Sequence, residues 1–130
     1  MFKYMFLFIF VFTSCVSLNR SQKDVVREMH RYSVDADDIK SPGLAGALNL
    51  LPGIGNFYLA SGTQEKDQWI IGFLNFITWP LSPLWGIPQA AMDATAYNEK
   101  ETADYFLYDP RGRTEWQGYK SRGYSREGRY

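Results

Sequence analysis

Two uncharged stretches dominate the centre of the chain and predict a pair of apolar helices. No Asp, Glu, Lys or Arg occurs in residues 44–60 or 68–92, and the polar stretch 61–67 lies between them. Residues 69–78 are apolar around almost the whole helical circumference, which is typical of a helix buried on every side, in protein or in lipid. Three prolines follow by position 88, and proline breaks or kinks a helix. We therefore expect a helical hairpin over residues 44–95, built either as two broken membrane helices or as a compact hairpin in the membrane interface.

Glycines beside aromatic residues predict how this hairpin packs. A glycine has no side chain, so the backbone of one helix can lie close to the other helix, and a neighbouring aromatic ring fills the groove beside it. The expected helix-packing residues are Gly53, Gly55, Phe57, Tyr58, Gly72 and Phe73.

The same residues carry a resemblance to a known family. The series Gly53-x-Gly55-x-Phe57-Tyr58-Leu59, followed by Gly72, Trp85 and Asp93, resembles the bacterial two-transmembrane-helix domain, often called the TM-two domain. The resemblance covers residues 44–95 and implies a membrane-embedded helical hairpin without a catalytic site. The chain departs from the family pattern at Ala60, where glycine is favoured, and in the prolines that crowd the second helix.

Three tryptophans at the edges of the apolar stretches indicate a membrane boundary. An apolar ring with a single N–H donor is most at home at the level of the lipid headgroups. Trp69, Trp79 and Trp85 are therefore the expected interface residues, with an ordinary aromatic core as the alternative.

The segments on either side of the hairpin predict further helices. Ser21 and Asp24 have the spacing of a capping box, and we expect a short helix to begin there, inside a tether that spans residues 15–43. A third helix is expected to begin at Pro88, because proline is favoured in the first helical turn, and to continue through residues 96–110. Asp93 then complements the dipole of this helix, or is an ionisable group at the membrane edge.

The C-terminal residues 111–130 interleave Arg, Gly and Tyr and contain few aliphatic residues, so we expect a disordered tail. The predicted fold class is therefore mainly α: a small membrane-associated helical hairpin with flanking helices and a disordered C-terminal tail.

Charge adds one asymmetry to this picture. The chain has 14 basic and 14 acidic residues, so it lacks the global positive field that nucleic-acid binding needs, and no nucleic-acid partner is expected. The tail alone has an excess of basic residues. It is interpreted as a solubilising tail, or as one that contacts an anionic surface or a partner protein.

The N-terminus has the order of a signal peptide. Lys3 precedes the apolar run 4–12, and small residues lead to the sole cysteine of the chain. Phe12-Thr13-Ser14-Cys15 resembles the bacterial lipobox, in which the cysteine is lipidated and becomes the first mature residue, although Leu is more usual where Phe12 stands. We expect residues 1–14 to be the signal peptide. An ordinary signal peptide, or a retained anchor with an incidental cysteine, is the alternative.

Candidate catalytic and metal-binding residues are few. His30 is the single histidine and has no recognisable nucleophile partner, so no enzyme activity is expected. The acidic cluster at 35–38 lacks the glycine and the distal glutamate of a calcium loop and is interpreted as a solvated turn. No metal or cofactor is expected.

Two classes of function are compatible with these features. The first is a cell-envelope lipoprotein with a structural or protein-interaction role, held by membrane lipid through acylated Cys15 and bound to an envelope protein or to its own copies. The alternative is a small integral-membrane hairpin that modulates or perturbs membranes or membrane proteins. In a cell with two membranes, we expect the protein at the inner face of the outer membrane, since Val16 and Ser17, and no aspartate, directly follow the cysteine.

Overall fold

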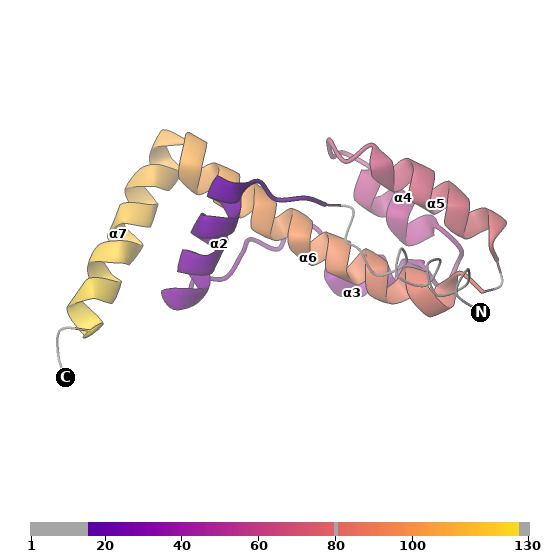
Figure 1. Cartoon of the computed structure of the whole chain (residues 1–130), viewed down its shortest axis with the longest axis horizontal. Coiled ribbons are helices and arrows are strands. Elements are labelled where there is room, and N and C mark those ends of the chain that lie inside the picture. Colours follow the sequence, from indigo (N-terminus) through magenta and orange to yellow (C-terminus); the bar gives the residue numbers. More distant parts are fainter. Residues whose placement is uncertain (1–15, 80, 128–130) are drawn as a thin grey trace, which may run out of the picture. The chain divides into compact units, whose positions relative to one another are not determined.

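The computed structural model describes residues 16–79 and 81–127, and its regular secondary structure within these ranges is entirely helical (Figure 1). The prediction of a mainly α fold is confirmed. The predicted signal peptide and Cys15 lie outside the described residues. The helices are α2 (Arg20–Arg31), α3 (Pro42–Leu48), α4 (Ile54–Ala60), α5 (Asp67–Ile77), α6 (Pro83–Tyr108) and α7 (Pro110–Glu127).

The chain forms two compact units whose segments alternate along the sequence. The first, which we call the amide unit, includes the described residues 16–17 and residues 39–97, and therefore α3, α4, α5 and the first part of α6. The second, the aromatic unit, combines residues 18–38 with the described residues after 97, and so contains α2, the end of α6 and α7.

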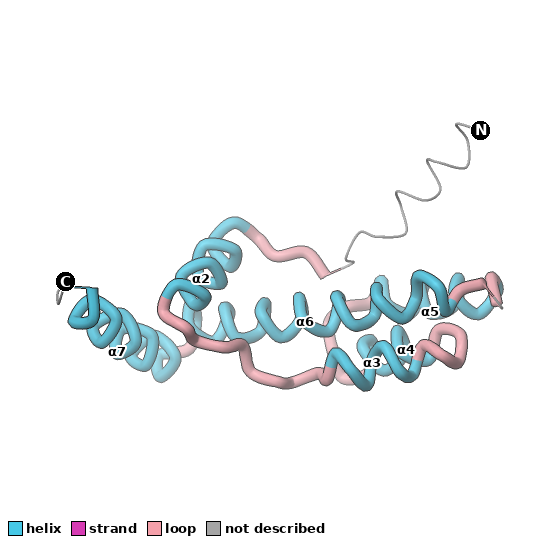
Figure 2. Tube along the Cα trace, turned by 90° about the horizontal axis from the view of Figure 1, so that it is seen from below, coloured by secondary structure: helices cyan, strands magenta, loops and turns pink. Residues whose placement is uncertain are grey.

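The first apolar stretch forms two short helices instead of one arm of a hairpin. α3 ends at Leu48, and α4 begins at Ile54 after a turn that contains Gly53 at φ 80°. Glycine adopts this left-handed conformation without the steric cost that a side chain would add. α4 packs against both α3 and α5, and Figure 2 shows these three helices beside α6.

The expected start of the third helix at Pro88 is wrong. α6 begins five residues earlier, at Pro83, and Pro88 lies inside the helix. Ser82 precedes the helix, and its carbonyl accepts the backbone N–H of Gly86 at 2.8 Å. Asp93 consequently lies well beyond the first turn of α6, so its carboxylate does not complement the dipole at the start of this helix.

In the aromatic unit, α2 begins earlier than the sequence pattern predicted. Asn19 and Gln22 form a reciprocal capping box, in which each backbone N–H donates to the other residue's side-chain oxygen, at 2.7 and 2.9 Å. These two amide side chains cap the helix in place of Ser21 and Asp24.

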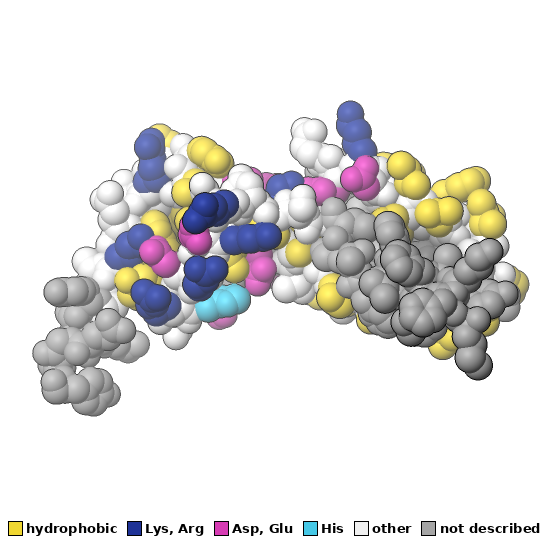
Figure 3. All heavy atoms as spheres, in the orientation of Figure 1, with side chains coloured by type: hydrophobic (Ala, Val, Ile, Leu, Met, Phe, Trp, Pro, Cys, Tyr) yellow, Lys and Arg dark blue, Asp and Glu magenta, His cyan; other side chains and the backbone are white. Residues whose placement is uncertain are grey.

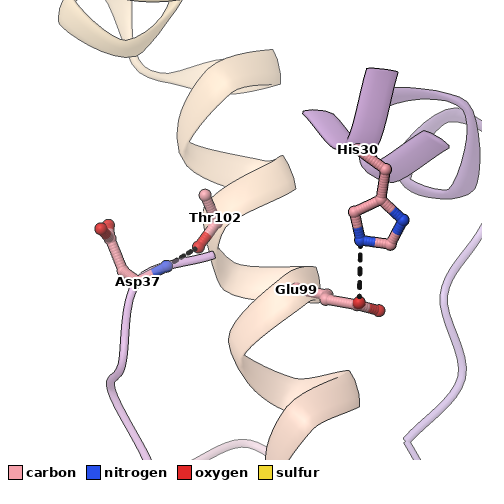
Figure 4. Close-up of polar contacts among 4 residues, drawn as sticks. All are labelled: His30, Asp37, Glu99 and Thr102. Carbon is pink, nitrogen blue, oxygen red and sulfur yellow. Dashed lines mark hydrogen bonds and ion pairs between the residues drawn. The ribbon is translucent and has the colours of Figure 1, made fainter. Parts of the chain in front are cut away.

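Residues 18–38 are also more than a tether, because they pack against the end of α6. The Asp37 backbone N–H donates to Thr102 Oγ1 at 2.9 Å, and His30 Nε2 lies 3.5 Å from Glu99 Oε1 (Figure 4). His30 is a helix-surface residue with most of its ring exposed.

The predicted disordered tail is instead the helix α7. Trp116 is buried and stacks on Phe106 with ring centroids 4.9 Å apart, and the edge of Tyr32 meets Trp116 at 5.9 Å. Aromatic side chains thus supply the apolar burial that the tail lacks in aliphatic residues. At Gly112 a Cβ would overlap the backbone carbonyl of Tyr105, so glycine permits a close return of the chain after α6.

Candidate functional site

The interior of the amide unit is rich in polar side chains for an ordinary soluble domain. Its buried apolar residues among those described are mostly small: Ala45, Ala60, Ala90 and Ala94, with Val16, Leu59 and Tyr97. Its buried polar side chains are as numerous: Asn49, Asn56, Gln68, Asn75, Ser82, Gln89 and Asp93.

Asn56 on α4 is the centre of a hydrogen-bond network inside this unit, and its side chain is completely buried. Its Oδ1 accepts from Asn49 Nδ2 and from Asn75 Nδ2, each at 2.9 Å. Its Nδ2 donates to Gln68 Oε1 at 2.8 Å. One amide therefore connects the residue after α3 with two positions on α5.

The network continues from these neighbours to α6. Gln68 Nε2 donates to Asp93 Oδ2 at 2.7 Å, and Asp93 is completely buried. Trp85 Nε1 donates to Asn75 Oδ1 at 2.9 Å. Asn49 Nδ2 also donates to the Gly86 carbonyl at 2.6 Å. We call these residues the amide network: Asn49, Asn56, Gln68, Asn75, Trp85 and Asp93.

The energetics of this network depend on every member having a partner. A buried amide or carboxylate is costly unless it is hydrogen-bonded, whereas a fully bonded network holds its elements in one arrangement. Among the described residues, Ser82 Oγ is the buried side-chain polar atom without a partner. The network therefore connects four segments through directional bonds, beside a small apolar cluster formed by Ala45, Leu59, Ala90 and Ala94.

Close backbone approach supplements these bonds at the glycines singled out by the sequence. A Cβ at Gly53 would overlap the Gly72 carbonyl, and a Cβ at Gly72 would overlap the Phe57 ring. At Gly55 it would overlap the Ala45 carbonyl and the Asn49 side chain. These positions bring α3, α4 and α5 close together.

Two of the predicted packing aromatics differ in their surroundings. Phe73 does not pack, because it lies on the outer side of α5 with 60% of its surface exposed. Tyr58 is half-buried and packs against the cluster of Ala45, Leu59, Ala90 and Ala94. Its hydroxyl also accepts the Ser41 backbone N–H at 3.2 Å, and Lys40 Nζ lies 4.6 Å from its ring centroid.

Within α5, polar and small residues are buried and large apolar residues are exposed. Its buried residues Gln68, Gly72 and Asn75 recur at spacings of four and three residues and form one polar and small stripe. The remaining surface is exposed and carries large apolar side chains, and Figure 3 shows hydrophobic side chains gathered over this helix. We call the following exposed residues the apolar face: Trp69, Ile70, Phe73, Leu74, Phe76, Ile77, Trp79, Leu81 and Leu84.

The three tryptophans predicted to lie at a membrane boundary differ in their surroundings. Trp69 and Trp79 belong to the apolar face, with more than half of each side chain exposed, and the Trp69 ring also meets Phe57 at 5.3 Å. Trp85 is half-buried, and its only N–H is used inside the unit by Asn75. Trp69 and Trp79 are thus the two tryptophans whose exposed rings can contact the surroundings of the protein.

In the described ranges, no three His, Cys, Asp or Glu side chains form a group suited to a metal ion. No described helix has both the length and the apolar character needed to cross a bilayer. No family model, curated protein or solved structure matches the chain. The resemblances to the lipobox and to the TM-two domain therefore stay predictions.

Proposed function

We propose that the protein is a cell-envelope lipoprotein, anchored through acylated Cys15, whose amide unit rests with its apolar face in the membrane interface. The observation that carries the proposal is the inverted polarity of this unit, with amides and a carboxylate inside and large apolar side chains outside. Its role is structural or interactive: the lipid and the apolar face hold the chain at the membrane, and the aromatic unit is available to envelope components.

The physical basis is that such a unit is suited to an apolar medium. In water, each large apolar side chain left exposed forgoes about 1.5–3 kcal/mol that burial would give. Contiguous exposed patches of this kind are rare in soluble monomers and mark membrane or protein contacts. In lipid the hydrophobic effect no longer holds helices together, and interhelical hydrogen bonds and close packing at small residues replace it. The amide network and the glycine contacts supply both.

The geometry favours an interfacial position over a spanning one. α5 has 11 residues, which at about 1.5 Å per residue is far less than the roughly 30 Å of a hydrocarbon core. A second attachment beside the lipid is also useful, because one acyl chain alone binds membranes only marginally.

A second candidate uses the same apolar face against a protein. An envelope protein or a second copy of the chain would also cover it, and the shortness of the helices is compatible with that arrangement. The alternative of a hairpin that itself perturbs membranes would require the amide unit to insert without the lipid anchor.

Tryptophan fluorescence in vesicles that contain brominated lipids tests the proposal. Full chains that retain only Trp69 or only Trp79, with the other tryptophans replaced by phenylalanine, should be quenched by the bromines. A chain that retains only Trp116, which is buried in the aromatic unit, is the matched control and should be quenched much less. Equal quenching of all three, or none, would contradict the interfacial placement.

Extraction of the exported Cys15→Ala variant separates the candidates. If the apolar face reaches the lipid, part of this variant stays with the membranes in high salt and leaves only with detergent. If the face is covered by a protein, the variant elutes as a complex or oligomer without detergent.

A further inference from the structure

The outward side of α2 carries a row of basic side chains. Its members recur at spacings of three and four residues, which places them on one side of the helix. The other side of α2 is buried in the aromatic unit through Val25, Val26 and Met29. All four cations are exposed, and Figure 3 shows Lys and Arg side chains gathered over α2 and α7. We call these residues the basic row: Arg20, Lys23, Arg27 and Arg31.

Most of the positive charge in this row is not neutralised. Asp24 Oδ1 lies 3.6 Å from Arg27 Nη1, and both side chains are well exposed, so this pair is weak. The other three cations have no ion-pair partner within the part of the chain that the structure describes. Glu28, the other acidic residue of α2, is engaged by Lys120 Nζ at 2.5 Å.

Two basic residues of α7, where the sequence predicted an anionic contact, are engaged by neighbouring groups of the aromatic unit. Lys120 pairs with Glu28 and lies 5.3 Å from the centroid of the Trp116 ring. The Arg122 guanidinium lies 4.8 Å from the Tyr119 ring centroid, and its Nε donates to the Gly118 carbonyl at 3.2 Å. Arg111 and Arg113 are exposed near the start of α7, but α2 presents four cations on one side, so the larger cationic surface is on α2.

We propose that the basic row binds anionic phospholipid headgroups of the membrane in which the chain is anchored. This inference rests on the proposed lipidation of Cys15. Arg20 follows Cys15 by five positions, and even a fully extended chain spans at most about 18 Å over that distance. Attraction is largely screened beyond one Debye length, about 8 Å at physiological salt, so the row acts by lying directly on the headgroups, which this short connection to the acyl anchor permits.

The expected contribution of the row follows from the charge of the lipid surface. Each Lys or Arg near an anionic membrane surface contributes about 1 kcal/mol, which is about fivefold in affinity. An acyl chain joined to a basic cluster is a combination that makes membrane attachment stable.

Vesicle binding by the full chain with Cys15→Ala tests the proposal without the acyl chain. Vesicles of phosphatidylcholine alone are compared with vesicles that also contain phosphatidylglycerol, at low and at high salt. We expect the anionic vesicles to bind at least tenfold more tightly, and the preference to fall as salt rises. Replacing Lys23→Gln together with Arg31→Gln should remove most of this preference.

A pair of equal charge on α7 is the matched control. Arg111 and Arg113 are exposed in the same unit, so Arg111→Gln with Arg113→Gln removes the same charge from another helix and should lower the affinity less than threefold. The charge-conserving pair Lys23→Arg with Arg31→Lys should bind as the parent does, which excludes a folding defect.

Equal losses from the α2 and α7 pairs would overturn the basic row, because net charge alone would then explain binding. Absence of any preference for anionic vesicles would also overturn it. If the Cys15→Ala chain does not bind neutral vesicles but still prefers anionic ones, the result would count against membrane contact by the apolar face. It would still support the basic row.

Discussion

At the scale of single residues, Gly72 lies where the Phe57 ring meets α5, and a side chain added there has no space. We expect Gly72→Leu to lower the free energy of unfolding by about 1–3 kcal/mol, because overpacking forces the ring or the backbone to move. Urea or thermal unfolding in detergent measures the effect.

Gly118 on α7 is the matched control for this substitution, since a Cβ there meets nothing within 4 Å. Gly118→Ala should stabilise the chain by up to roughly 1 kcal/mol, as expected for an unobstructed helix glycine. A Gly72→Leu chain as stable as the parent would show that the Phe57–Gly72 contact does not limit the packing.

The amide of Asn56 makes a second prediction at this scale. Asn56→Leu keeps a similar size but leaves Asn49 Nδ2, Asn75 Nδ2 and Gln68 Oε1 without the partner they have in the parent. Each buried unsatisfied group costs about 1–3 kcal/mol, so we expect a loss of several kcal/mol in the free energy of unfolding.

Gln64→Leu, at an exposed position before α5, should change the stability by less than about 0.5 kcal/mol in the same assay. If both substitutions had equally small effects, the amide network would not be what holds the amide unit together.

The sequence pattern predicted the glycine contacts but not the amide network. Glycine beside aromatics has a direct geometric meaning, because only a missing side chain permits such closeness. Asn49, Asn56 and Asn75 lie in the two uncharged stretches. An amide side chain is also uncharged, so the absence of charge does not distinguish it from an apolar side chain. The signal was present on α5, where Gln68, Gly72 and Asn75 share the one side that is not apolar.

At the scale of helices, α7 is the element whose prediction failed, and Trp116 explains why. Trp116→Ala should destabilise the aromatic unit by about 3–5 kcal/mol, because the Phe106 and Tyr32 rings lose their stacking partner and a cavity remains. Hydrogen exchange measures it, with faster exchange expected for the backbone amides of α2 and α7.

The exposed Trp79 is the control for that experiment, since Trp79→Ala removes an equal side chain with little burial. Exchange in α7 that is already unprotected in the parent would contradict an ordered helix there. The segment was predicted to be disordered because it has few aliphatic residues. Its burial comes instead from aromatic rings that three separate elements contribute.

At the scale of the whole molecule, lipidation at Cys15 is the property on which the proposed function depends. We expect the mature chain to begin at Cys15, with acyl groups that add their mass, and Cys15→Ala to abolish that mass. Intact-mass measurement of protein purified from membranes decides it. A mature N-terminus elsewhere, or an unmodified cysteine, would be incompatible with the lipobox interpretation.

The location of the anchored chain is a separate prediction. In a cell with two membranes, we expect density-gradient fractionation to find the protein with outer-membrane markers, because Val16 and Ser17, and no aspartate, follow the cysteine. Placing an aspartate at position 16 should shift it toward the inner membrane. Accumulation of the parent with inner-membrane markers would contradict the prediction.

The division of the aromatic unit between two separate segments of the chain sets an order in time. A chain is synthesised from its N-terminus, so α2 emerges first, but residues 98–127 that complete its unit emerge last. At about 5–20 residues per second, the amide unit is complete some seconds before α7 exists. During that interval the apolar side of α2 has no native partner. We therefore expect nascent chains stopped after residue 97 to need a holding chaperone for α2, and nascent chains that include α7 to release it.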